Sequence, residues 1–138
     1  LQSMMLLDTR YLPGFALSGF SEDSVSEYAR SIREVYSDKQ SNMLRSVIQY
    51  LTDAFPERNR HLKKISIPIV AYLADMAMDA GIEPLSFRQW WEFFTQEDPL
   101  FEAYRPFCGS GSGEREKIYG RLAVMAKSFA AYHRIESP

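Results

Sequence analysis

The sequence has almost no cysteine and no long apolar run. Cys108 is the single cysteine among 138 residues, so the chain cannot form an internal disulfide or a cysteine-rich metal site. This composition suits a reducing, cytoplasmic environment. The longest apolar runs are a handful of residues, far short of the roughly 20 that a membrane-spanning helix requires. We therefore expect no membrane partner, and no residue pattern predicts a cofactor.

The N-terminus lacks a secretory signal, because residues 1–7 contain no positive segment and no sufficiently long apolar core. The chain begins with Leu rather than Met, so we interpret residues 1–4 as a cleavage or fusion remnant and residues 5–138 as one helical domain. An internal methionine at position 4 or 5 would make the chain a piece of something longer. Residues 5–20 mix glycine and proline with large apolar side chains, which predicts an irregular apolar N-terminal arm on the core.

The remaining sequence repeats apolar residues at intervals of three and four and shows no useful alternating pattern. With 46% hydrophobic and 25% charged residues, it is typical of a folded globular domain rather than a disordered chain. The sequence thus predicts an all-α fold, an irregular or orthogonal bundle of five to six helices without significant sheet. Helices are predicted at about 22–36 and 114–134. Between them, apolar residues at helical spacing run from Met43 to Phe55, from Ile69 to Ala80 and from Phe87 to Phe94, which predicts three further helices, and another turn or two follows Asp98-Pro99.

Several residues mark the expected helix ends. Pro68 suits the first turn of the most apolar helix, and Gly81 suits a left-handed stop after it. Ser86 is the expected N-cap of the following aromatic-rich helix. Residues 37–40 are expected to form a polar break before the second helix.

A basic segment precedes the most apolar helix. Arg58, Arg60, Lys63 and Lys64 place four positive charges within seven residues of a chain whose net charge is -2. Such a cluster could neutralise nucleic-acid phosphates and release their counterions. The alternative is a solvated connector between two helices, because charge runs between helices are usually surface features. We take these four residues as the candidate nucleic-acid-binding set.

An aromatic block forms the second candidate surface. Phe87, Trp90, Trp91 and Phe94 share one helical face, which is most often core. Phe93 and an edge of one tryptophan could remain exposed and mark a partner surface. Trp90, Trp91 and Phe93 are therefore the candidate residues for contact with a protein partner or a second copy of the chain.

No catalytic set or metal site stands out. Asp75 and Asp79 lie four residues apart on one helix face. A buried Asp75 could be paired with an arginine such as Arg121, which explains it as well as a metal would. Cys108 could act as a nucleophile only beside a histidine, and a structural thiol is the simpler interpretation. The glycine-rich segment 109–113 does not fit a phosphate-binding loop and is interpreted as a connector.

Residues 60–130, about half the chain, resemble a known family. The series "KKISIPIVAYLADMA", "FRQWWEFF", "GSGSGE" and "GRLAVM" is similar to the C-terminal helical extension of ParB-like, GmrSD-type restriction nucleases, large bacterial proteins that cut modified phage DNA. The match includes Pro68, Trp90, Gly109-Ser110 and Arg121. The Asp-Gly-Gln-Gln-Arg signature of that nuclease segment does not occur in this sequence, so no active-site residue is carried over. The resemblance implies a helical accessory domain that supports DNA or partner binding.

Three interpretations follow from the sequence. The first is a non-catalytic helical accessory domain of a bacterial protein that contacts nucleic acid through its basic segment. The second is a protein interaction or oligomerisation module that uses exposed aromatic side chains. The third, least favoured, is an enzyme, because no nucleophile, base and stabiliser can be named together.

Overall fold

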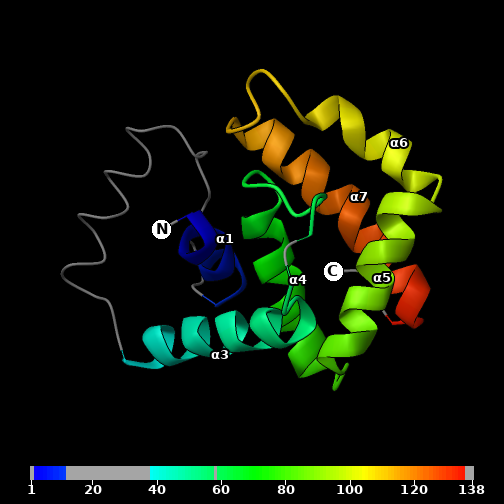
Figure 1. Ribbon diagram of the computed structural model, residues 1–138. Helices are drawn as coiled ribbons and strands as arrows, with labels where there is room; N and C mark the ends of the chain where they lie inside the picture. Colours follow the sequence, from blue (N-terminus) through cyan, green and yellow to red (C-terminus); the bar gives the residue numbers. More distant parts are fainter. Residues whose placement is uncertain (1, 12–37, 58, 136–138) are drawn as a thin grey trace.

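The computed structural model describes residues 2–11, 38–57 and 59–135 (Figure 1). These residues form six α-helices and a short 3-10 helix, η1, with no strand element among them, which confirms the all-α prediction. The helices are α1 (Gln2–Tyr11), α3 (Asp38–Ala54), α4 (Ile67–Asp79), α5 (Pro84–Gln96), α6 (Leu100–Tyr104), η1 (Arg105–Phe107) and α7 (Arg115–His133).

Helix α4 is the central element, and α1, α3 and α7 all pack against it (Figure 1). Pro68 lies in its first turn, as predicted. At its C-terminus Gly81 has φ +72°, and the N–H groups of Gly81 and Ile82 bond the carbonyls of Met78 and Ala77 at 3.1 and 2.8 Å. This pair of bonds is the Schellman ending that a glycine permits. No helix within the described ranges has the length and apolar character needed to cross a bilayer.

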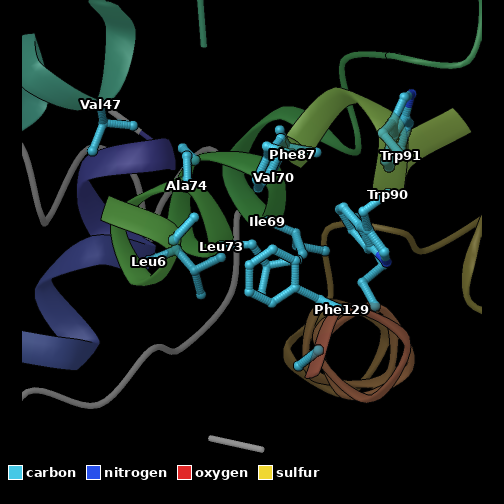
Figure 2. Close-up of a cluster of buried hydrophobic side chains, with 14 of the residues drawn as sticks. Leu6, Val47, Ile69, Val70, Leu73, Ala74, Phe87, Trp90, Trp91 and Phe129 are labelled. Atoms are coloured by element: carbon cyan, nitrogen blue, oxygen red, sulfur yellow. The ribbon is translucent and has the colours of Figure 1, made fainter. Parts of the chain in front are cut away.

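The core is built from apolar residues of α1, α3, α4, α5, α6 and α7, and Figure 2 shows the part of it around α4 and α5. The ring of Phe129 lies edge-on to Trp90, with centroids 5.1 Å apart, and 5.7 Å from Phe87. Such packing contributes beyond the area that the rings bury. The labelled core residues are Leu6, Val47, Ile69, Val70, Leu73, Ala74, Phe87, Trp90, Trp91 and Phe129.

A polar chain runs from the buried core to the half-buried start of α6. The indole Nε1 of Trp90 donates to the hydroxyl of Ser128 over 3.0 Å, and that hydroxyl donates to the carboxylate of Asp98. The other oxygen of Asp98 accepts the N–H of Leu100 over 2.9 Å at the start of α6. The chain therefore fixes α5, α6 and α7 relative to one another while leaving the buried indole N–H satisfied.

Three boundaries differ from the sequence-based expectation. Residues 5–11, predicted to be irregular, belong to helix α1, because Met5, Leu6 and Leu7 can be buried together against the core from a helix. Helix α3 begins at Asp38, within the expected polar break. Helix α5 begins at Pro84 with Glu83 as N-cap, two residues before Ser86, because proline at the first helical position is preorganised for the turn. The helix predicted at 22–36 and arm residues 12–20 lie outside the described residues.

The buried carboxylate of α4 does pair with an arginine, but with Arg10 of α1 rather than Arg121. Asp75 is 3% exposed, and the guanidinium of Arg10 bonds both Asp75 and, over 3.1 Å, Asp79. One arginine thus bridges the two carboxylates that are four residues apart. Arg121 is also buried, and its Nη1 donates to the Phe107 carbonyl over 2.7 Å, so it fixes η1 against α7.

Candidate nucleic-acid interface

The predicted basic segment forms the connector between α3 and α4, which we call the basic connector (residues 55–66). Its described residues, 55–57 and 59–66, form bends and turns. The N–H of Leu62 bonds the carbonyl of Asn59 over 3.1 Å, and the N–H of Ser66 bonds that of Lys63 over 2.9 Å. The hydroxyl of Ser66 lies 2.8 Å from that of Tyr104 on α6. The connector is therefore fixed at its C-terminal end before α4 begins.

Asn59 fixes the middle of the connector. Its Oδ1 accepts the indole N–H of Trp91 over 3.3 Å and the backbone N–H of His61 over 2.9 Å. Both partners are donors, so the oxygen must face them, and the amide nitrogen Nδ2 must face away. Within the described part of the chain, Nδ2 has no hydrogen-bond partner. Asn59 was not among the candidate residues from the sequence; the signal that could have indicated it is an amide within a cationic run.

Three of the four predicted cations are presented together on this connector. Arg60, Lys63 and Lys64 are all exposed, and none of them forms an ion pair with a described residue. The Nε of Arg60 donates to the ring nitrogen Nε2 of His61 over 3.2 Å. Arg58, the fourth predicted cation, lies outside the described residues.

His61 reports the electrostatics of this surface. Burial lowers its pKa first, and the neighbouring charges of Arg60 and Lys63 lower it further. Repulsion by like charges disfavours a protonated ring. Its ring meets Phe101 of α6 edge-on, with centroids 6.3 Å apart. The connector therefore concentrates positive charge around His61.

An open pocket of about 680 Å³ is lined by residues of the connector itself. Its apolar side consists of Phe55, Pro56 and Leu62. The polar side carries the three cations and Asn59, together with the exposed carboxylate of Glu57. The lining residues are Phe55, Pro56, Glu57, Asn59, Arg60, Leu62, Lys63 and Lys64.

The predicted aromatic interface is wrong for both tryptophans. Trp90 is 0% exposed and Trp91 is 1% exposed, because the face they share with Phe87 and Phe94 is the core face of α5. Phe93 lies on another face, half-buried, with its ring 5.4 Å from that of Tyr132 on α7.

Phe93 and Tyr132 contribute to a second open pocket, of about 530 Å³, between α5 and the end of α7. Tyr132 is 41% exposed. The pocket also contains two glutamates that form no ion pair with a described residue. Its remaining lining residues are Gln89, Glu92, Gln96 and Glu97.

The other sequence candidates have structural roles. The Sγ of Cys108 lies 3.7 Å from the carbonyl oxygen of Tyr104. The two histidines, which a nucleophilic Cys108 would need beside it, have their rings packed against aromatic side chains instead. The carboxylate of Glu114 lies beside Gly111, which would repel an anion from this glycine-rich loop. Within the described ranges, no group of three or more His, Cys, Asp or Glu residues is placed to hold a metal ion.

Comparisons with protein-family models, with curated proteins and with solved structures found no match for this chain. The resemblance to the helical extension of ParB-like, GmrSD-type nucleases therefore stays a prediction from the sequence.

Proposed function

We propose that this chain is a non-catalytic helical accessory domain of a bacterial protein, and that it binds nucleic acid through the basic connector. The observation that carries the proposal is the joint exposure of Arg60, Lys63 and Lys64 without an ion pair to any described residue. Cations already paired with carboxylates would have to break those pairs before binding a phosphate. Arg60, Lys63 and Lys64 have no ion pair with a described residue to break before they bind a phosphate.

Electrostatics and geometry support the same partner. A phosphate that meets a lysine or arginine releases condensed counterions, which favours binding at low salt. The protein has a net charge of only -2, so its attraction for a polyanion must come from a local surface rather than from the whole molecule. Asn59 holds the turn that carries the cations, which reduces the ordering that binding would otherwise require.

The direct test compares two double variants with equal loss of charge. In Arg60→Ala with Lys63→Ala, affinity for a fluorescein-labelled 12-nucleotide single strand, measured by anisotropy at low salt, is expected to fall at least tenfold. In the matched control, Arg45→Ala with Lys127→Ala, two exposed cations are removed elsewhere, and the affinity is expected to change less than threefold. Equal losses in both variants, or no binding by the unmodified protein to either the single strand or its duplex, would contradict the proposal.

A second candidate function is contact with a protein partner at the Phe93 and Tyr132 pocket. The favouring observation is an exposed ring beside two glutamates without described ion-pair partners, since exposed aromatic side chains often mark interfaces. Sedimentation equilibrium over a hundredfold concentration range tests self-association. A mass that rises with concentration in the unmodified protein and not in Tyr132→Ser would support this function, and a monomer throughout would remove a second copy as the partner.

A further inference from the structure

We infer that the pocket of the basic connector holds a single unpaired nucleotide, with its base against the apolar side and its phosphate on the cations. The inference rests on the proposed nucleic-acid binding and names its substrate class, single-stranded rather than duplex nucleic acid. Phosphate binding alone needs no pocket, because cations on a flat surface suffice. What the structure adds is an apolar wall and an oriented amide beside the cations.

The apolar wall suits a base. Phe55 is half-buried, and its ring is held edge-on to Phe87 of the core at a centroid distance of 6.3 Å. Pro56 and Leu62 complete the wall. Because every base has an apolar face, such a wall binds unstacked bases with little sequence preference. A volume of about 680 Å³ lies within the usual range for small-ligand pockets.

Asn59 supplies a polar contact for the base. Two donors occupy Oδ1, at 3.3 and 2.9 Å, so its Nδ2 is the atom left to bind a ligand. An amide nitrogen donates, and base carbonyls and ring nitrogens accept. In a duplex these edges are paired and stacked inside the helix, so a base can enter a pocket only when it is unpaired or flipped out.

The cations border the same pocket. Arg60, Lys63 and Lys64 all line it, so a nucleotide on the apolar wall would have its phosphate within the cationic side. Glu57 is the one carboxylate among the lining residues, and it disfavours a second phosphate there. We therefore expect one nucleotide to be held in the pocket while its neighbours follow the exposed cations.

The test uses the full chain and three 12-nucleotide probes, measured by anisotropy at one low salt concentration. The probes are a mixed-sequence single strand, its duplex, and a single strand in which the central four nucleotides are abasic. We expect the single strand to bind about tenfold more tightly than both other probes. Equal binding of the intact and abasic strands, or tighter binding of the duplex, would overturn the inference and leave the proposed function standing. Failure of all three probes to bind would overturn both.

One variant tests the hydrogen bond from the Asn59 amide to the base separately from the packing of the base on the apolar wall. Asn59→Asp keeps the Oδ1 acceptor for Trp91 and His61 and removes the Nδ2 donor. Its added negative charge weakens the intact and abasic strands equally, so their affinity ratio reports the base contact. We expect that ratio to fall about fivefold from its value in the unmodified protein, because a hydrogen bond to the base is lost. An unchanged ratio would remove Asn59 from the binding site.

Discussion

The indole Nε1 of Trp91 donates to Oδ1 of Asn59 over 3.3 Å, so the buried face of α5 is tied to the basic connector. Trp91 was a candidate for an exposed aromatic interface, yet it is 1% exposed. Its role is to hold the turn from which Arg60 and its neighbours project. The aromatic block and the basic segment of the sequence are therefore in contact. The buried aromatic face of α5 supports the connector that carries the cations.

Asn59→Ala is expected to destabilise the protein by about 1–2 kcal/mol. The indole N–H of Trp91 and the N–H of His61 would both lose their acceptor, and an unsatisfied buried donor costs more than the bond itself contributes. Urea unfolding followed by tryptophan fluorescence measures the change. Asn59→Asp is the matched control, because it keeps the oxygen, and it should lose less than half as much stability. Equal losses would show that the hydrogen bonds do not hold the connector.

Gly120→Ala is expected to destabilise the protein by about 1–3 kcal/mol, although alanine is the better helix former. A Cβ on Gly120 would lie 2.3 Å from Cδ1 of Phe107, so the ring of Phe107 would have to leave its packing position on α7. In a Phe107→Ala background the obstruction is absent, and Gly120→Ala should then stabilise the helix by up to about 1 kcal/mol. Thermal unfolding of all four proteins measures this cycle, and the same sign in both backgrounds would contradict it.

Asp75→Asn is expected to cost about 3 kcal/mol of stability and Asp79→Asn less than about 1 kcal/mol. Both carboxylates bond Arg10, but the side chain of Asp75 is 5% exposed and that of Asp79 is 61% exposed. Solvent screens the ion pair of Arg10 with Asp79 and not the pair of Arg10 with Asp75. Urea titration of the two variants at neutral pH measures the difference, and equal costs would show that burial does not decide the strength of this bridge.

Stability is expected to decrease as the pH falls from 8 to 5.5. Burial lowers the pKa of His133, whose ring packs on Phe129 with centroids 4.7 Å apart. The unfolded chain, with an ordinary histidine pKa near 6.5, therefore takes up its proton first, and stability present above that pKa is lost below it. His61, whose pKa is also lowered, acts in the same direction.

The check is the free energy of unfolding at both pH values. His133→Gln should lose less stability over this range than the unmodified protein, and His61→Asn should lessen the loss in the same way. An identical decrease in His133→Gln would show that His133 does not contribute to the pH dependence.

Local signals predicted much of the fold. Pro68 and Gly81 indicated both ends of the central helix, because each residue type suits one backbone conformation at a helix end. The repeat of apolar residues likewise placed α7. Ser86 misled, because a serine is a good N-cap in isolation, while Pro84 begins the helix two residues earlier. Whether the helix begins at Pro84 or after Ser86 depends on how α5 packs against the core. The sequence pattern does not specify that packing.

The exposed cations of the candidate site were indicated by the sequence. Charge clustering indicated Arg60, Lys63 and Lys64, since exposure of long cationic side chains is the usual outcome. Sequence alone could not place Asn59, because its partner Trp91 is 32 residues away. It also could not find Arg10 as the partner of Asp75, 65 residues away. Such pairs depend on which helices meet.

The most direct test of the account is the salt dependence of single-strand binding. Three phosphate contacts predict that the logarithm of the association constant falls with the logarithm of salt concentration with a slope of about -2, since each contact on a single strand contributes about -0.7. Removing Arg60 and Lys63 together should bring the slope to about -0.7. An affinity that is the same from low to high salt, or a slope that these substitutions leave unchanged, would contradict binding through the basic connector.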